Sequence, residues 1–346
     1  MKRLLAILLL TTLSQAIHAR NYTEIELVKD NNSSVPDATS NKSKREGWVL
    51  LHYAVDEKGK TGNYLVIDSN NSETYLSKTI KHLENLEFKP ATLDGKPVAS
   101  SRFYIMQFEK AFFQSNNNGM SRAFNRRYNK ISDALANNRL DDASANLQEL
   151  RDDYAKNLTE QALSAWLHAL YYYAVQDWYA YRDATQVAFY LRDSLPAHIS
   201  MQNIQNLMQW QMYKKNYSGA AYTLGALNRL EGVSLTEEAF NKSKQDISNA
   251  FYKEPLIKID SQLSANNAWF YRLTGSNISI DVHQGKIHTK SLRCNDAIID
   301  LSDVELNEFK APNAESECFL FVKGDAGTQF TYTEKEQYEN LAPYFE

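Results

Sequence analysis

Apolar and polar residues alternate between Gly47 and Phe108, and this alternation predicts strands. In the stretch WVLLHYAV, every second side chain is apolar and falls on one face, at Val49, Leu51, Tyr53 and Val55. Period-two alternation is typical of a half-buried strand. The stretch DEKGK that follows predicts a tight turn, and NYLVIDS predicts the second strand of a hairpin.

A helix and a third strand are expected after this hairpin. Ser72 is a suitable N-cap for the stretch SETYLSKTIKHLENLEF, in which apolar residues recur at helical spacing at Leu76, Ile80 and Leu83. Pro90 stops this helix, and SRFYIMQFE predicts the third strand. Residues 46–112 therefore predict a small αβ domain with the order strand, strand, helix, strand.

Helical periodicity replaces the alternation over residues 120–254. The segments NNRLDDASANLQEL, VQDWYAYRDATQVA and KKNYSGAAYTLGAL each open a second helix after a polar turn, at Leu140, Trp178 and Tyr217, which stand 38 and 39 residues apart. A period of this length is typical of helical hairpins stacked in a solenoid. An ordinary helical bundle is the alternative.

Small residues follow the first and third of these anchors. Ala143 and Ala220 each stand three residues after an anchor, whereas Tyr181 takes that place in the middle segment. The array resembles degenerate tetratricopeptide repeats, which implies an all-α domain with a concave surface for a peptide or a helix. The aromatic stretch YYYAVQDWYAY, residues 171–181, allows two interpretations: a partner-binding groove or, favoured by its helical spacing, core between helices.

Alternation returns after Pro255. NISIDVHQGKIHTKSL alternates around a Gln-Gly turn, and AIIDLS, CFLFVKG and TQFTYTE predict further short strands. Residues 255–333 therefore predict a small antiparallel β-domain, and residues 334–346 a tail. The whole chain is expected to be a multidomain α+β protein.

The N-terminus has the pattern of an exported protein. Residues 1–19 place two cations before a short apolar run that ends in small residues, which is typical of a signal peptide. This run is shorter than the ~20 residues of a membrane span, so a retained inner-membrane anchor is the less favoured alternative. Residues 20–45 are mostly polar and predict a flexible linker.

Cys294 and Cys318 are the two cysteines of the chain. In an exported protein an even pair predicts a disulfide, which would close a loop within the C-terminal β-domain. Two separate buried thiols are the alternative.

Charge and motif content exclude several function classes. The net charge of −4 and the scattered Lys and Arg residues give no surface for a phosphate backbone, so nucleic acid is not an expected partner. The 12 glycines are spread too thinly for a phosphate loop or a nucleophile elbow.

One constellation could carry metal chemistry. Asp281, His283 and His288 would share a face if the Gln-Gly dipeptide formed a two-residue hairpin turn, and could then bind zinc or copper. The favoured interpretation is a solvated strand face, because Lys286 adds a cation to the same patch. We therefore expect no catalytic residue, cofactor, metal or small-molecule substrate.

Several motifs, in order, give residues 46–109 a family resemblance. AVDEKGKTGNYLVIDS, then a helix, then LEFKPATLDGKPV are similar to the C-terminal domain of TonB-type energy transducers, which share a Val-Asp-x-x-Gly turn, a Phe-x-Pro-Ala step and an Asp-Gly-Lys-Pro-Val loop. The Tyr-Pro segment that often precedes the family's first strand has no counterpart here. The sequence therefore does not decide whether this chain has the small strand that the segment sometimes contributes in the family.

The resemblance implies that the domain binds a short extended segment of an outer-membrane receptor by adding it as a strand to a sheet edge. The candidate edge is the last strand, with seven candidate partner-binding residues: Arg102, Phe103, Tyr104, Ile105, Met106, Gln107 and Phe108. An edge covered by the helical repeats is the alternative.

These features predict a periplasmic, TonB-related scaffold or accessory protein in TonB-dependent outer-membrane transport. Its expected partners are proteins, either an outer-membrane receptor segment or inner-membrane motor components. One alternative is an energy transducer with a retained N-terminal anchor, facing the periplasm; the short linker, with Pro36 as its single proline, disfavours it. Another is an envelope assembly or regulatory scaffold unrelated to transport.

Overall fold

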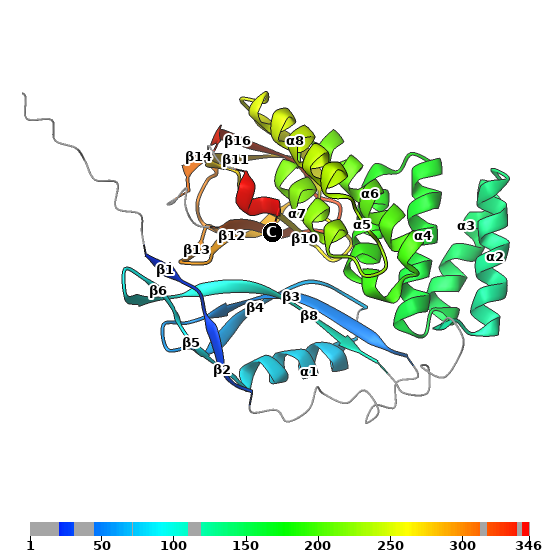
Figure 1. Cartoon of the computed structure of the whole chain (residues 1–346), viewed down its shortest axis with the longest axis horizontal. Coiled ribbons are helices and arrows are strands. Elements are labelled where there is room, and N and C mark those ends of the chain that lie inside the picture. The colour runs from blue at the N-terminus through cyan, green and yellow to red at the C-terminus, as the bar shows by residue number, and fades with distance from the viewer. Residues whose placement is uncertain are drawn as a thin grey trace, which may run out of the picture.

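The computed structural model describes residues 21–30, 45–70, 72–109, 119–311, 317–337 and 341–345. They form a mixed α+β protein in which a sheet with one helix, a set of helical hairpins and a β-sandwich pack together (Figure 1). The predicted signal peptide lies outside the described residues. No helix of the described part is both long and apolar enough to cross a lipid bilayer.

The N-terminal module contains the three predicted strands and the predicted helix, but three short strands that were not predicted lie between the helix and the last strand. The helix also ends earlier than predicted, at Glu84, because Leu86–Lys89 forms a strand before Pro90. Its antiparallel sheet has the order β4 (Thr61–Ser69), β3 (Gly47–Val55), β8 (Ser100–Phe108). Helix α1 (Glu73–Glu84) begins at Ser72, whose side chain accepts a hydrogen bond from the Tyr75 amide. Tyr75 and Leu83 of α1 are fully buried with Val49 and Leu51 of β3, which form the predicted core face. The strand is not half-buried, however, because Trp48, Leu50 and His52 on its other face are buried against the other modules.

Residues 21–30 belong to this module, contrary to the expectation of a flexible linker over residues 20–45. Strand β1 (Tyr22–Thr23) pairs with β6 (Ala91–Leu93), which also pairs with β7 (Lys96–Val98), and β2 (Glu26–Asp30) pairs with β5 (Leu86–Lys89). Between β1 and β2, Ile25 is buried in the core. Backbone pairing holds this segment together with the buried Ile25 and with Tyr22, which packs on the same core. Residues 31–44 of the predicted linker lie outside the described part.

Three helical hairpins follow, with helix starts at the predicted anchors. The hairpins consist of α2 (Arg122–Ala136) with α3 (Leu140–Glu149), α4 (Leu158–Ala174) with α5 (Trp178–Tyr190), and α6 (Ala197–Tyr213) with α7 (Tyr217–Asn228). A π-helical turn (Leu150–Tyr154) continues α3, and α8 (Glu237–Tyr252) follows the last hairpin. Leu140, Trp178 and Tyr217 are the first residues of α3, α5 and α7.

The three hairpins also share one turn geometry. Asn138, Gln176 and Lys215 each have a positive φ, of 54°, 60° and 58°. The amide of the next residue donates to the carbonyl five residues back, as from Asp177 to Tyr172 at 3.0 Å; the other two turns use Arg139 to Ala134 and Asn216 to Gln211, both at 2.8 Å. A left-handed residue followed by this bond is a Schellman-type helix end, and its recurrence makes the hairpins structurally equivalent at their turns.

The C-terminal module consists of two four-stranded antiparallel sheets. One has the order β10 (Ala268–Arg272), β15 (Cys318–Gly324), β12 (Ile287–Cys294), β13 (Ile298–Asp300). The other has the order β14 (Asn307–Lys310), β11 (Gly275–Gln284), β16 (Gln329–Gln337), β9 (Ile257–Gln262). Cys294 and Cys318 face each other on β12 and β15 and form the predicted disulfide.

The predicted hairpin around Gln284 and Gly285 does not form. Strands β11 and β12 belong to different sheets, so the turn carries the chain from one sheet of the sandwich to the other. The alternation that suggested a hairpin is genuine, but each strand uses it to pair elsewhere: β11 with β14 and β16, β12 with β13 and β15.

The end of the chain is more ordered than the predicted tail over residues 334–346. Strand β16 continues to Gln337, and a short 3₁₀ helix (Ala342–Phe345) docks against α7. Leu341, Tyr344 and Phe345 are buried, and the Tyr344 hydroxyl donates to the Leu273 carbonyl at 2.5 Å. These apolar side chains complete the core shared by the sandwich and α7, which explains why the segment is fixed.

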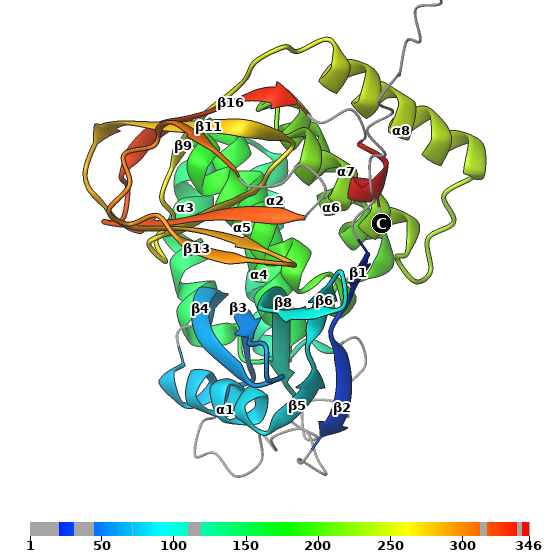
Figure 2. The ribbon, with the colours of Figure 1, turned by 90° about the vertical axis from the view of Figure 1, so that its left-hand side faces the viewer.

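The three modules pack directly on one another. Figure 2 shows the sheet of β3, β4 and β8 below the sandwich, with the helices behind both. Trp48 and Leu50 of β3 lie in one apolar cluster with residues of the helical hairpins and with Phe321 of β15. The carboxylate of Glu46 accepts the Leu158 amide at the start of α4 at 2.8 Å. A negative charge is favourable at a helix N-terminus, so this bond helps fix the first module against the hairpins.

Candidate functional site

The predicted binding strand, β8, lies at an edge of its sheet. It pairs with β3 along its whole length, from Ser100 opposite Val55 to Phe108 opposite Gly47. Within the described ranges, no strand pairs with its other side. A strand in this position presents backbone N–H and C=O groups along its free side.

The seven candidate residues of β8 divide between two faces and serve different purposes. Met106 and Phe108 are buried against α1, where Tyr104 also packs, so these side chains stabilise the first module. Arg102 pairs with Glu24, at 2.7 Å, ahead of β2. Phe103 points to the opposite side. The strand therefore combines structural side chains with a backbone edge.

Ile105 is the candidate residue that is most open to solvent. Its side chain is 40% exposed, although it lies opposite the buried Leu50 of β3. Gln107, two residues further along the same face, is partly exposed. The second half of β8 thus offers an apolar contact next to its free backbone side.

Phe103 lies in an aromatic interface between the first module and the sandwich. Its ring centroid is 4.9 Å from that of Phe319 and 5.2 Å from that of Phe270. His52 of β3 is fully buried beside it, 4.6 Å from Phe321. Burial, and then the positive charge of Arg293, lower the pKa of His52 to about 3. A neutral histidine among phenylalanine rings is a packing residue here.

Arg293 of β12 secures the same interface through Asn63, near the start of β4. Its guanidinium donates to the carbonyl of Asn63 at 2.9 Å and to the side-chain oxygen of Asn63 at 2.7 Å. Asn63 has a positive φ of 47°, which turns both oxygens toward β12. Burial lowers the pKa of Arg293 to about 10, and the group remains a cation that holds two modules together.

The three residues of the possible metal site are not all brought together: Asp281 and His283 approach each other at 3.8 Å, but His288 does not join them. His283 lies 2.7 Å from the Thr331 hydroxyl, whereas His288 lies 2.8 Å from Asp325 across a different strand pair. Because β11 and β12 belong to different sheets, Asp281 and His288 do not face each other. The described residues hold no group of three or more His, Cys, Asp or Glu side chains placed to bind a metal ion.

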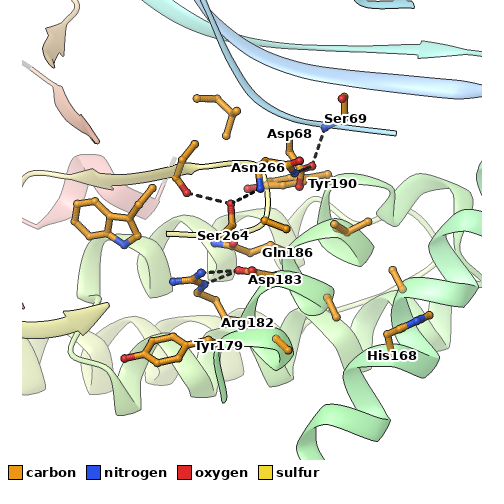
Figure 3. A pocket seen from close by; sticks show the side chains of 18 of the residues that line it. Asp68, Ser69, His168, Tyr179, Arg182, Asp183, Gln186, Tyr190, Ser264 and Asn266 are labelled. Atoms are coloured by element: carbon orange, nitrogen blue, oxygen red, sulfur yellow. Dashed lines mark hydrogen bonds and ion pairs between the residues drawn. The ribbon is translucent and has the colours of Figure 1, made fainter. Parts of the chain in front are cut away.

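A cavity of about 710 Å³ lies where the three modules meet. Its walls come from the end of β4, from α4, α5 and α6, and from the connection between β9 and β10. Figure 3 shows Asp68 and Ser69 on one side, Arg182, Asp183 and Gln186 below them, and Ser264 and Asn266 between. No sequence motif indicated this site, because its residues lie in segments that are nearly two hundred residues apart.

Asp68 is the charged group at the upper wall of this cavity. Its carboxylate accepts the amide of Ser69 at 2.7 Å and the side-chain amide of Asn266. Within the described part of the chain, no cationic group forms an ion pair with it. Burial, with a further contribution from Asp183, raises the pKa of Asp68 to about 7.

Asp183 has a cationic partner in the neighbouring residue of α5. Arg182 approaches its carboxylate at 2.7 Å and also donates to the Ser261 hydroxyl at 3.3 Å. Burial raises the pKa of Asp183, while the positive charge of Arg182 lowers it. The pair therefore joins α5 to β9. Asp260 of β9 also lines the cavity without an ion pair among the described residues, but it is exposed, so Asp68 is the more enclosed carboxylate without a cation.

Aromatic side chains supply much of the remaining wall. Tyr190 and Trp48 lie with ring centroids 6.2 Å apart, and Tyr172 and Tyr179 line the cavity from α4 and α5. The aromatic stretch 171–181 thus fits neither interpretation as a whole. Tyr181 is buried between helices, whereas Tyr173 is 60% exposed.

Comparison with known proteins identifies no relative: no protein-family model matches the sequence, and no curated protein matches it significantly. The β8 edge and the cavity are therefore the features from which a function can be inferred.

Proposed function

We propose that this chain is an exported protein-interaction scaffold that binds an extended segment of a partner protein along the free edge of β8. The observation that supports the proposal is the position of β8, nine residues long and paired on one side alone within the described ranges. An extended segment that adds to such an edge gains main-chain hydrogen bonds, and side-chain contacts at alternate positions give selectivity. Ile105 would supply one such contact.

The resemblance of residues 46–109 to the C-terminal domain of TonB-type transducers supports the same binding mode. We therefore place the scaffold in the periplasm, as an accessory of TonB-dependent outer-membrane transport, with a receptor segment as the partner. A transducer with a retained anchor and an envelope assembly scaffold would use the same edge. The burial of Trp48 and Leu50 against the helices favours a scaffold, because pulling on the first module would expose them.

In this proposal the helical hairpins are degenerate tetratricopeptide-like repeats that act as a support. Their recurrent turns and the buried Ala143 and Ala220 support this assignment. Part of their surface carries the other two modules, with Phe321 of the sandwich in the cluster of the hairpins. The repeats would thus hold the β8 edge in a fixed orientation.

Site-specific photocrosslinking tests where the partner binds. A photoreactive phenylalanine analogue at Ile105 should capture a partner segment in cells, while the same analogue at Tyr222 of α7, a residue with a similar exposed fraction of 44%, should not. Mass spectrometry then identifies the segment, and an outer-membrane receptor would favour transport over envelope assembly. Equal capture from both positions would contradict the proposal.

Backbone methylation tests how the partner binds. A synthetic peptide of the captured segment is N-methylated at one residue at a time and titrated against the full exported chain. Strand addition uses every second amide, so affinity should fall at alternate residues and persist at those between. Tolerance of methylation at every position would show a different binding mode.

A further inference from the structure

The cavity between the modules holds a charge arrangement that the β8 edge does not use. Arg182 and Asp183 neutralise each other at 2.7 Å, whereas Asp68 accepts hydrogen bonds from Ser69 and Asn266, neither of which is a cation. Burying a carboxylate without a cation disfavours the folded state. A buried charge that lowers stability is more typical of a functional site, where activity trades against stability, than of a structural one.

The cations that line the same cavity are engaged elsewhere. Arg151 pairs with Asp152 at 3.3 Å. Lys214 lies over the ring of Trp210, 5.0 Å from its centroid. Arg45 donates to the Arg151 carbonyl at 3.4 Å. The space beside Asp68 therefore has a negative wall with no protein cation bound to it within the described residues.

The aromatic side chains of the cavity have the complementary property. Tyr190 and Trp48 line the cavity with ring centroids 6.2 Å apart, and Tyr190 lies beside Asp68 (Figure 3). The negative face of an aromatic ring attracts a cation. Burial, and then the negative charges of Asp68 and Asp183, raise the pKa of Tyr190. A volume of about 710 Å³ falls within the range of small-molecule sites, roughly 300–1,000 Å³.

We propose that this cavity binds a small organic cation, an ammonium or guanidinium group on an aromatic or apolar body. The positive group lies at Asp68 and the body packs against Tyr190 and Trp48. An anionic ligand of the same shape is disfavoured by the carboxylate of Asp68, whose charge no protein cation among the described residues offsets. The site is separate from β8 and does not depend on strand addition.

Three probes of one shape test the charge preference: tryptamine, its neutral analogue tryptophol and the anionic indole-3-propionate. Each is titrated calorimetrically into the full exported chain. Tryptamine should bind at least about tenfold more tightly than tryptophol, and indole-3-propionate most weakly. Equal affinities for tryptamine and tryptophol, or no binding by tryptamine, would overturn the proposal.

Two variants of the same cavity test the position of the cation. Asp68→Asn should remove the preference for tryptamine, because the amide keeps the shape and loses the charge. Asp260→Asn is the matched control, since Asp260 also lines the cavity but already accepts the Thr331 hydroxyl at 2.7 Å. Asp260→Asn should keep the preference for tryptamine over tryptophol. If Asp260→Asn lost this preference and Asp68→Asn kept it, the cation would lie away from Asp68 and the assignment would be overturned.

A third variant keeps the test informative if Asp68→Asn does not fold. Tyr190→Leu removes a ring face and leaves every charge in place. It should weaken tryptamine several-fold while leaving tryptophol less affected. A parallel loss for both probes would show that the ring provides apolar contact alone and would contradict the proposed cation site.

Discussion

At the scale of single residues, the charge of Asp68 makes stability depend on pH. The pKa of its carboxyl is about 7 in the folded chain against an ordinary value of 3.8. Between these values the folded state keeps a proton that the unfolded state has lost. Stability therefore falls as pH rises from about 4 to about 7, and this contribution is up to about 4 kcal/mol from three pKa units.

Asp68→Asn should abolish this loss of stability with rising pH. We expect the variant to match the parent chain near about pH 4 and to exceed it in unfolding free energy above about pH 7, as measured by urea denaturation over a pH series. Glu334, whose pKa burial also raises to about 7, titrates equally in both proteins and cancels in the comparison. Parallel stability curves for variant and parent would show that Asp68 is ionised at no cost.

The contribution of His52 to stability changes with pH in the opposite direction. Its pKa is about 3 when folded against 6.5 ordinarily, so the unfolded chain takes up a proton first as pH falls. Its contribution to stability is complete above about pH 6.5 and is lost as pH falls toward 3, by about 2 kcal/mol at about pH 5. His52→Leu, of similar volume, should lose less stability than the parent between about pH 7.5 and pH 5 in urea titrations. An unchanged acid response would mean that the imidazole can be protonated in place.

At the scale of elements, the recurrent turns of the hairpins carry a small strain. Gln176 holds a left-handed conformation, which costs a residue with a side chain roughly 1 kcal/mol relative to glycine. Gln176→Gly should therefore stabilise the chain by up to about 1 kcal/mol, partly offset by the entropy of glycine in the unfolded chain. Gln176→Val should destabilise it, because a β-branched residue fits this conformation poorly. Thermal unfolding distinguishes the two variants, and equal midpoint temperatures for both would contradict the left-handed conformation of Gln176.

Local signals predicted the elements well because their causes are local. The N-cap at Ser72 and the starts of α3, α5 and α7 each depend on a few neighbouring residues, and the structure has them where the sequence predicted them. The disulfide followed from composition, since Cys294 and Cys318 had no other partner. Within the first module, the alternation of β3 predicted its core face.

The pairing between distant segments could not be predicted from local signals of this kind. The alternation around Gly285 fits a hairpin and a sheet-to-sheet connection equally well, and distant strands decide between them. Residues 21–30 include Tyr22, Ile25, Leu27 and Val28, but the polar residues that follow them suggested one flexible linker, and the distant strands β5 and β6 that pair with them cannot be recognised locally. The cavity is the extreme case: Asp68, Asp183 and Asn266 belong to three modules, and their proximity follows from how the modules dock.

At the scale of the whole molecule, docking of the modules makes the β8 edge part of a rigid body. The buried face of β3 and β8 meets the sandwich through His52, Phe103 and Phe321, and Arg293 adds charged hydrogen bonds across the same interface. Apolar burial of this kind couples the unfolding of neighbouring modules, because the unfolding of either module exposes the contact surface of the other to water.

Phe103→Ala tests this coupling. The parent chain should unfold in one transition, and the variant, which loses several ring contacts and about 2–3 kcal/mol of burial, should show two separated transitions by calorimetry. Ile105→Ala, on the same face of β8 but 40% exposed, is the matched control and should keep a single transition. If Phe103→Ala also unfolds in one step with an unchanged midpoint, the aromatic interface does not hold the first module. The orientation of the β8 edge would then be set by the contacts of Trp48, Leu50 and Glu46 with the helices.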